Sequence, residues 1–257
     1  MRRPEIVVLS DIHLGTYGCH ADELLDYLKS IQPNILILNG DIIDGWQFKK
    51  NYFPANHYAV IQKFIKFLKQ GTKIYYLTGN HDDFLRRISG LQIADFSIKE
   101  HLNLTIDGKK HWFFHGDVFD SSVTISPWIA KLGGKGYDLL IRVNRIINRT
   151  LAKMNKPPMS FSKKIKSSVK NAVKFISDFE QTAIDMAVHE KNDVVVCGHI
   201  HQPIIRKEEV NGRSILYLNS GDWVENLTAL EYENGEWKLY DYFESIEITS
   251  DELMEVK

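Results

Sequence analysis

The sequence is poor in cysteine and has no long apolar run. Cys19 and Cys197 are the only cysteines among 257 residues, too few for a disulfide framework, and Cys197 lies in the apolar run VVVC, where a buried thiol is expected. The apolar stretch after MRRPE is too short for a signal peptide, and no run approaches the ~20 apolar residues of a membrane-spanning helix. These absences predict a protein of a reducing compartment, soluble or at most peripheral to a membrane.

Charge is nearly balanced overall but uneven along the chain. The sequence has 32 Lys plus Arg and 33 Asp plus Glu, a net charge of −1. From Lys131 to Lys174 there are 12 basic residues and one acid, Asp138, so this segment carries +11 and the remainder carries −12. Such asymmetry indicates either a basic face for an anionic ligand or surface, or simply a pair of well-solvated helices.

Six short runs rich in β-branched and aromatic residues predict buried strands: EIVVL, NILIL, KIYYL, HWFF, DVVVC and SILYL. Between the first three, the stretches ADELLDYLKSI and HYAVIQKFIKFLKQG have the apolar spacing of amphipathic helices. This alternation predicts an α/β layered fold. Near the C-terminus, LTALEYENGEWKLYDYF has Asn-Gly between two alternating runs and predicts a hairpin.

Residues from about 121 to 190 have helical spacing and no strand signal, and Pro157 and Pro158 would divide the region. We therefore expect a single domain over residues 1–257, within which a helical cap is inserted at about 121–175. A further helix, about FISDFEQTAIDMAVHE, would lead back into the sheet.

Polar residues follow five of the predicted strands, in SDIHLG (10–15), NGDIIDG (39–45), TGNHDD (78–83), FHGD (114–117) and CGHIH (197–201). The carboxyl ends of strands in an open α/β sheet share one edge, so these residues are expected to converge. Asp11 and His13 are two residues apart, as are His199 and His201, and each pair can chelate one ion. Asp41 is placed to be shared. Imidazole and carboxylate ligands without thiolate suit manganese, iron or zinc.

Each motif alone has a plainer explanation, because clusters of Asn, Asp and Gly usually mark turns. Five of them in order, all at strand ends, predict a dinuclear metal site instead. The other histidines are expected at the surface or at the ends of helices and strands: His57, His101, His111 and His189. Asp117 and Asp222 are expected to orient ligand histidines.

The series Asp-x-His, Gly-Asp-x-x-Asp, Gly-Asn-His-Asp, His-Gly and Gly-His-x-His spans about residues 6–225 and resembles the calcineurin-like metallophosphoesterase superfamily. The resemblance implies a four-layer αββα sandwich of two mixed sheets and two divalent metal ions, with manganese expected and iron or zinc as alternatives. Carried over position by position, it implies one ion held by Asp11, His13, Asp41 and His201. The other ion would be held by Asp41, Asn80, His115 and His199.

The same resemblance implies that His81 donates a proton to the leaving group, and that Asp44 hydrogen-bonds this histidine and raises its pKa. Two cations about 3.5–4 Å apart lower the pKa of a shared water and neutralise phosphate oxygens. The expected chemistry is therefore hydrolysis of a phosphoester or diphosphate.

Within the superfamily, the motif spacing and the helical insertion resemble the UDP-2,3-diacylglucosamine diphosphatase group of lipid A synthesis. The resemblance implies hydrolysis of UDP-2,3-diacylglucosamine to UMP and 2,3-diacylglucosamine 1-phosphate by a cytoplasmic protein in peripheral contact with the inner membrane. The stretch KKIKSSVKNAVKFI has one apolar and one basic helical face, which suits a lipid cover beside an anionic membrane. Candidate substrate contacts on it are Lys166, Lys170, Asn171 and Lys174.

Three alternatives stay open. His81 departs from that group, which has arginine at this position, so a phosphodiesterase or phosphatase acting on another lipid-linked or nucleotide substrate is the first. The second is a nuclease, although few aromatic residues are interleaved with the basic segment, and nucleic acid is the less favoured partner. The third is a non-catalytic scaffold, which the presence of every ligand position disfavours.

Overall fold

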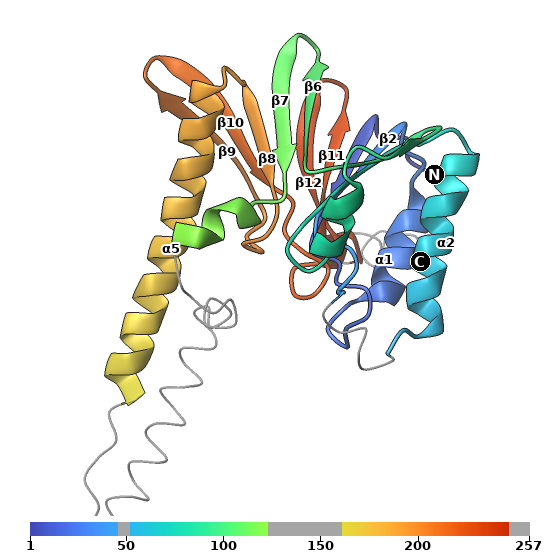
Figure 1. Cartoon of the computed structure of the whole chain (residues 1–257), viewed down its shortest axis with the longest axis horizontal. Helices are drawn as coiled ribbons and strands as arrows, with labels where there is room; N and C mark the ends of the chain where they lie inside the picture. The colour runs from blue at the N-terminus through green and yellow to red at the C-terminus, as the bar shows by residue number, and fades with distance from the viewer. Residues whose placement is uncertain (46–51, 123–160, 247–257) are drawn as a thin grey trace, which may run out of the picture. The chain divides into compact units, whose positions relative to one another are not determined.

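The computed structural model describes residues 1–45, 52–122 and 161–246, and of residues 120–122 and 161–172 it describes only the backbone. The chain divides into two compact units, one formed by Met1–Val118 with Ile184–Lys257 and the other by Phe119–Ala183. Both sheets belong to the first unit (Figure 1). None of the helices in these ranges combines the length and the apolar character that a membrane span requires.

The first sheet has seven strands in the order β12-β11-β1-β2-β3-β5-β4. Its parallel centre consists of β1 (Ile6–Leu9), β2 (Ile35–Asn39), β3 (Lys73–Leu77) and β5 (Phe96–Lys99), with β4 (Gln92–Ile93), β11 (Thr228–Glu233) and β12 (Glu236–Asp241) antiparallel to their neighbours. Leu9 pairs with Leu38 and Asn39 with Leu77, so the carboxyl ends of β1, β2 and β3 lie at one edge.

The second sheet has five strands in the order β6-β7-β8-β10-β9. The strands β7 (Lys109–Phe114), β8 (Val194–Cys197) and β10 (Arg213–Asn219) are parallel, and β6 (His101–Ile106) and β9 (Ile204–Val210) are antiparallel edge strands. All six predicted strands are present. The additional β4, β5, β6 and β9 escaped prediction because they are short or carry many polar residues, as in HLNLTI and IIRKEEV.

The predicted C-terminal hairpin is confirmed. The strands β11 and β12 pair through Glu233 and Glu236, and Asn234 and Gly235 form the turn with φ of 54° and 83°. Positive φ at both central residues is what a type I′ turn requires, and it matches the right-handed twist of the two strands.

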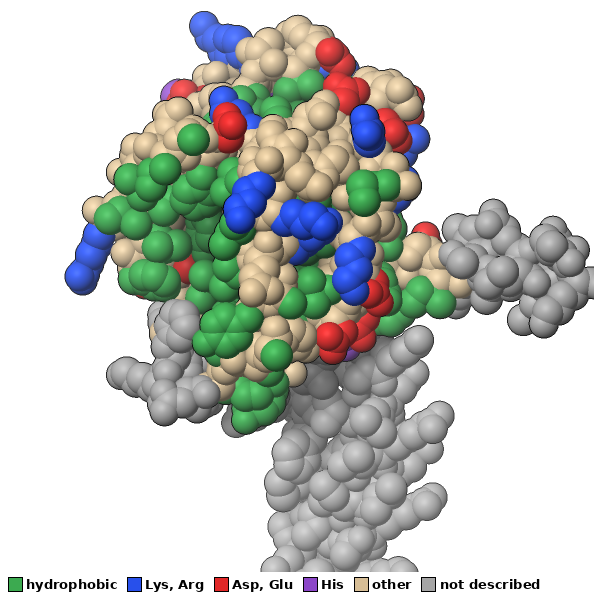
Figure 2. All heavy atoms as spheres, turned by 90° about the vertical axis from the view of Figure 1, so that its right-hand side faces the viewer, with side chains coloured by type: hydrophobic (Ala, Val, Ile, Leu, Met, Phe, Trp, Pro, Cys, Tyr) green, Lys and Arg blue, Asp and Glu red, His purple; other side chains and the backbone are tan. Residues whose placement is uncertain are grey.

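Helices α1 (Ala21–Ser30) and α2 (Ala55–Lys69) lie side by side against the first sheet (Figure 1). They pack onto the side chains of β1 and β2 that point outward, such as Val7, Leu9 and Leu36. Figure 2 shows that hydrophobic side chains also reach the surface on the face of the molecule that carries these helices. On α2 these include Tyr58 and Ile65, while Val60, Phe64 and Phe67 face the core.

A second apolar core fills the space between the sheets, because alternate residues of each strand point to opposite faces. Ile6, Val8 and Ile37 of the first sheet meet Phe113 and Val196 of the second. The structure thus confirms the expected α/β fold of two mixed sheets with flanking helices. The remaining elements are the short 3₁₀ helices η2 (Asp83–Ile88) and η3 (Asp117–Ser122) and the helix α5 (Phe161–His189).

The expected cap at about 121–175 falls mostly on residues outside the described ranges, as do Pro157 and Pro158. A single domain with an inserted cap therefore stays a prediction. The end of α5 belongs to the first unit, where the Arg213 side chain on β10 donates a 2.8 Å hydrogen bond to the carbonyl of Val188.

Candidate metal centre

The loops after five strands bring all seven predicted ligands to the edge of the two sheets. The loops after β1, β2 and β3 carry Asp11, His13, Asp41 and Asn80, and those after β7 and β8 carry His115, His199 and His201. Ligand-type atoms of Asp11, His13 and His201 lie within 4.8 Å of one another, and so do those of Asp41, His115 and His199. The first group holds three of the four residues that the resemblance implies for one ion, without Asp41. The second holds three of the four implied for the other ion, without Asn80.

Each buried carboxylate uses one oxygen for the backbone and turns the other toward imidazoles. Asp11 Oδ2 accepts the N–H of His199 at 2.9 Å, and its Oδ1 lies 3.2 Å from His201 Nε2. Asp41 Oδ1 accepts the N–H of His81 at 2.8 Å, and its Oδ2 lies 3.3 Å from His115 Nε2. In each case the backbone N–H fixes the carboxylate, and the other carboxylate oxygen faces an imidazole nitrogen.

Asp41 Oδ2 also lies 4.0 Å from the Nε2 atoms of both His13 and His81. The carboxylate is therefore surrounded by three imidazoles that come from three different loops. This is the environment expected of a ligand shared by two ions.

Buried polar atoms in the centre make no hydrogen bond to any described residue: Asp11 Oδ1, Asn80 Oδ1 and His115 Nε2. Such atoms are costly unless something else binds them. His115 Nδ1 contacts the carbonyl oxygen of Asn39 at 2.9 Å, which fixes the ring so that Nε2 faces Asp41. The donor set and its orientation fit divalent cations.

Five of the seven candidate ligands have left-handed backbone conformations. Asp11, His13, Asp41, His199 and His201 have φ between 52° and 68°. This region costs a non-glycine residue about 1 kcal/mol or more, and such residues cluster at functional sites.

Two glycines beside the ligands are needed for close packing. A Cβ atom on Gly79 would lie 2.2 Å from Asp41 Oδ1, and one on Gly40 would lie 2.4 Å from the His115 ring. Gly40 also has φ of 84°. The glycines of the GD and GN motifs therefore let the loops after β2, β3 and β7 touch, beyond allowing a tight turn.

Burial and charge act against each other on the ionisable groups. Burial lowers the pKa of His13 to about 4 despite the charges of Asp41 and Asp11, so this imidazole is neutral at pH 7, as a ligand must be. Burial also lowers the pKa of His115, but Asp41 and Asp11 outweigh it and raise that pKa well above its usual value. Conversely, burial raises the pKa of Asp11, but the charges of His201 and His115 bring it far below the usual range. The centre stabilises positive charge beside its carboxylates.

His81 and Asp44 lie together at the rim of the centre. His81 Nδ1 is 3.2 Å from Asp44 Oδ2. Burial lowers the pKa of His81, but the hydrogen bond to Asp44 and the charge of Asp41 outweigh it and raise the pKa above its ordinary value. His81 also lies within metal-binding reach of His13 and Asp41. The geometry thus suits a proton donor and also suits a ligand.

One residue that supports the centre, Asp82, was not identified from the sequence. Asp82 is fully buried and accepts hydrogen bonds from the N–H groups of Gly79 (2.6 Å) and Ile42 (2.9 Å) and from the Tyr76 hydroxyl (2.6 Å). It therefore ties the loop after β3 to the loop after β2. The GNHDD stretch shows an acidic residue here, but nothing in the sequence says which of its two aspartates turns inward.

Two of the remaining histidines are not at the surface as predicted. His57 is 1% exposed and its Nδ1 accepts the N–H of Gly15, and His111 is 2% exposed and accepts the indole N–H of Trp237. His57 does lie in the first turn of α2, as expected, but neither side chain is at the surface. A helix start and a strand interior can each bury a histidine that has a partner on another element. His101 and His189 are exposed, as expected.

The predicted second-sphere aspartates differ from each other. Asp222 Oδ2 lies 3.8 Å from His201 Nδ1, while its Oδ1 accepts the N–H of Val224 at 2.8 Å. Asp117 instead pairs with Arg86 of η2. The latter contact joins the loop after β7 to the segment that follows His81.

The predicted cap contacts lie on α5, in the second unit. Lys174 is exposed, and the side chains of Lys166, Lys170 and Asn171 lie outside the described part. Their approach to the metal centre stays a prediction.

A family model for calcineurin-like phosphoesterases matches residues 4–203, which include the whole metal centre. The chain belongs to this family. Members depend on two metal ions and hydrolyse phosphoesters, so the chain is a metal-dependent phosphoester hydrolase by family.

Curated relatives are distant but span the chain. A UDP-2,3-diacylglucosamine hydrolase of Aliivibrio fischeri (strain MJ11) is 23% identical over 91% of this chain and 97% of its own length. A DNA polymerase II small subunit of Thermoplasma acidophilum is 22% identical over 85% of this chain but only 45% of its own length. Among solved structures, an archaeal phosphodiesterase aligns over 92% of this chain with 15% identity and a TM-score of 0.43.

Proposed function

We propose that the chain hydrolyses UDP-2,3-diacylglucosamine to UMP and 2,3-diacylglucosamine 1-phosphate, as a step of lipid A synthesis. Hydrolysis of a phosphoester bond follows from the family. The proposed substrate is supported by relatives named UDP-2,3-diacylglucosamine hydrolase that align over about 90% of both chains, from Aliivibrio fischeri and Stenotrophomonas maltophilia (strain K279a).

The observation that carries the proposed activity is the pair of carboxylates that each face imidazoles across the two sheets. In the proposal, Asp11, His13 and His201 hold one ion, Asn80, His115 and His199 hold the other, and Asp41 is shared. Manganese is the proposed metal, because the ligands are oxygen and imidazole without thiolate. When bound, two such ions lower the pKa of a water between them and neutralise the charge that develops on the phosphoryl oxygens.

His81 serves as the proton donor to the leaving oxygen in this proposal. Its contact of 3.2 Å with Asp44 orients the ring and supports the protonated form. With 24% of its side chain exposed, His81 is more accessible than His13 and His115, which suits a group that meets the substrate.

The acyl chains are the proposed occupants of the predicted cap. The segment from Lys131 to Lys174 carries +11, and two acyl chains need an apolar cover beside a diphosphate that attracts cations. We place the protein in the cytoplasm, with peripheral contact to the inner membrane through this basic segment. Lys166, Lys170, Asn171 and Lys174 are the proposed contacts to the substrate.

Three substrates test the proposal: UDP-2,3-diacylglucosamine, UDP-N-acetylglucosamine and bis-nitrophenyl phosphate, assayed with manganese in ¹⁸O water. We expect a preference of ~10²-fold or more for the diacylated compound, since each buried methylene contributes ~0.8 kcal/mol and only part of that need reach the transition state. The label should appear in UMP, because attack at the α-phosphorus places the new oxygen there.

Equal rates on all three compounds would contradict the proposed substrate and favour a phosphodiesterase for another lipid-linked or nucleotide substrate. His81 in place of the arginine of the diphosphatase group is the observation that favours this second function. Substitution of a proposed contact, Lys174→Ala, should lower the rate on the diacylated substrate and leave that on bis-nitrophenyl phosphate unchanged.

A further inference from the structure

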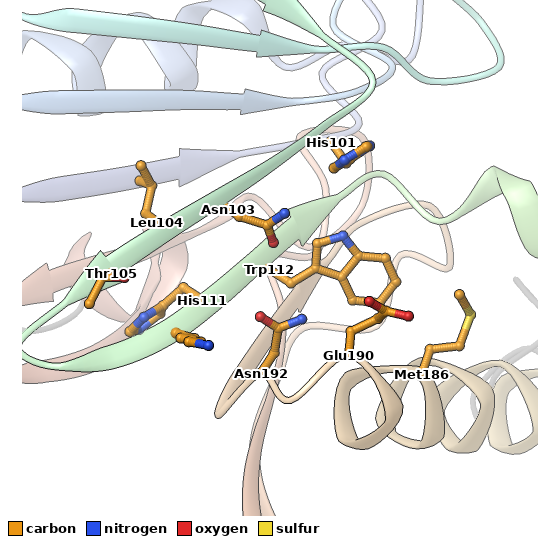
Figure 3. A pocket seen from close by; sticks show the side chains of 10 residues that line it. His101, Asn103, Leu104, Thr105, His111, Trp112, Met186, Glu190 and Asn192 are labelled. Atoms are coloured by element: carbon orange, nitrogen blue, oxygen red, sulfur yellow. The ribbon is translucent and has the colours of Figure 1, made fainter.

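A pocket separate from the metal centre lies on the outer face of the second sheet. It has a volume of about 530 Å³, and it is bordered by β6, β7 and the segment from Met186 to Asn192 at the end of α5 (Figure 3). We call it the outer-face pocket. Its volume is within the range of small-molecule sites, roughly 300–1,000 Å³.

Several side chains that line the outer-face pocket point away from the first sheet. On β6, His101, Asn103 and Thr105 are exposed, and they alternate with Leu102, which is part of the core between the sheets. On β7, Trp112 alternates in the same way with Phe113. The lining also includes Leu104, which packs against the core between the sheets, and His111, which accepts the indole N–H of Trp237 on β12.

The walls of the pocket are held in place by backbone contacts. Asp193 and Lys110 exchange two hydrogen bonds, one from each backbone N–H, of 2.9 and 2.8 Å. The Arg213 side chain donates to the carbonyls of Val188 and Asn192 at 2.8 and 3.3 Å. The end of α5 is thus fixed to β7 and β10, and the pocket is formed before any ligand arrives.

Trp112 is the centre of the pocket. Its ring stacks on Phe114 with the centroids 4.0 Å apart and the planes at 20°, and the indole is only half-buried. Figure 3 shows Asn103, Asn192 and Glu190 near this ring. A half-exposed indole fixed by a second ring is a platform on which another flat ring can stack.

The pocket also has two amides without partners. Asn192 is 7% exposed, and among the described residues its side-chain amide has no hydrogen-bond partner, nor has that of Asn103. Neither amide is among the buried polar atoms that lack a hydrogen bond, so both are open to water and each can offer donors and an acceptor to a ligand. An aliphatic ligand would leave both unpaired, whereas the edge of a heteroaromatic ring could pair with them.

The charges that line the pocket nearly cancel. Lys110 and Glu190 contribute one charge of each sign, and part of the Glu190 carboxylate accepts a 2.8 Å hydrogen bond from His189. The recognised part of the ligand is therefore flat, uncharged and equipped with donors and acceptors.

We propose that the outer-face pocket binds a planar heteroaromatic ligand of the purine kind through stacking on Trp112 and hydrogen bonds to Asn103 and Asn192. Purines fit better than pyrimidines because a two-ring system covers more of the indole. The site acts independently of the metal centre and of the function proposed for it.

The test is ligand-observed NMR and isothermal titration of the full chain with adenosine, guanosine and ribose. Nucleosides carry no phosphate, so the metal centre offers them little. We expect at least one purine nucleoside to bind with a Kd of roughly 0.1 mM and ribose not to bind. Trp112→Ala should weaken binding about 5- to 150-fold, which is the usual worth of stacking on an aromatic side chain.

Two amide variants extend the test. Asn192→Leu keeps the size of the side chain and removes its hydrogen-bonding groups. Asn103→Ala removes the amide at an exposed position, where folding is not in question. Each should weaken binding about 3- to 10-fold. Lys109→Ala, on the same hairpin but outside the pocket, is the matched control and should bind normally, as should Asp41→Asn in the metal centre.

Absence of saturable binding of either purine up to about 10 mM would overturn the proposal. It would also be overturned if binding persisted unchanged in Trp112→Ala and Asn103→Ala, or if Asp41→Asn abolished it. In the last case the nucleoside would be bound at the metal centre.

Discussion

The two sheets contribute different kinds of side chain to the metal centre. The first sheet carries all of the candidate oxygen ligands, Asp11, Asp41 and Asn80, together with one candidate imidazole, His13. The second sheet supplies only imidazoles, from His115, His199 and His201. The difference follows from what surrounds each loop, because the carboxylates are fixed by backbone N–H groups while the imidazoles reach across to them.

The loops of the first sheet are also bonded to one another. The N–H of Asp11 donates to Gly40, that of His13 to Asp41, and Leu14 pairs with Ile43 beyond the ends of β1 and β2. Across the sheets, the His199 N–H donates to Asp11 at 2.9 Å and His115 contacts the Asn39 carbonyl at 2.9 Å, while the carboxylate-to-imidazole pairs lie 3.2 and 3.3 Å apart. The first sheet is thus a preformed cradle of oxygen atoms, and metal ions would join it to the second sheet.

The largest effect is expected from Asp41→Asn, which removes the charge at the junction of the two sides. Both ions should be lost, and turnover of bis-nitrophenyl phosphate should fall beyond about 10⁴-fold, since each ion contributes several kcal/mol to the transition state. Elemental analysis and initial rates measure the two outcomes. Asp95→Asn, an exposed carboxylate on the first sheet, is the control. Retention of two ions per chain would show that Asp41 is not shared.

The second effect is expected from His81→Asn, which tests whether the first sheet supplies a proton donor besides its ligands. Metal content should stay near two ions, and turnover should fall ~10²–10⁴-fold, the usual worth of a positioned acid. Substrates with a nitrophenol leaving group should lose less, because that group needs little protonation. His189→Asn, which is exposed at the end of α5, is the matched control. Loss of an ion would instead make His81 a ligand.

The grouping of the candidate ligands could be predicted from the sequence, because each ligand has a local signal. Each ligand follows a run of β-branched residues, and parallel strands place their carboxyl ends at one edge, so Asp11, Asp41 and His115 could be grouped without a structure. The order of the strands in each sheet was not predictable, because register and neighbours depend on packing between distant segments.

Other features had little or no local signal. The left-handed backbone of five candidate ligands has only a weak signal in residue type, because Asp and His are enriched at positive φ but adopt it in a minority of cases. The burial of His57 and His111 depends on Gly15 and Trp237, which lie far from them in sequence. In contrast, Asn-Gly in the β11–β12 hairpin has a strong local preference, and there sequence and structure agree.

Removal of metal tests whether ions join the two sheets. Dialysis against a chelator should lower the thermal midpoint of the metal-loaded protein by about 5–10 °C for each ion, since a ligand at 100 times its Kd contributes about 2.7 kcal/mol and 1 kcal/mol shifts Tm by about 2–4 °C. Manganese should restore the midpoint. In Asp41→Asn the chelator should have no effect. An unchanged midpoint in the unsubstituted chain would mean that the sheets pack equally well without ions.

The smallest effect is expected from Asp82→Asn, which weakens the cradle without touching a ligand. The amide keeps the shape of the carboxylate but turns an N–H toward groups that are themselves donors, those of Gly79, Ile42 and Tyr76. Leaving one buried donor unpaired costs about 1–3 kcal/mol of unfolding free energy, which urea titration measures. Metal affinity should fall by about 10- to 100-fold, as for other groups that position ligands, because Asn80 lies in the loop that Asp82 holds.

The neighbouring Asp83→Asn is the matched control. Asp83 is exposed, so its substitution should change the free energy of unfolding by no more than about 0.5 kcal/mol and leave metal affinity unaltered. Equal effects of the two substitutions would contradict a special role for Asp82, and would leave the preformed arrangement of the first sheet to its backbone hydrogen bonds alone.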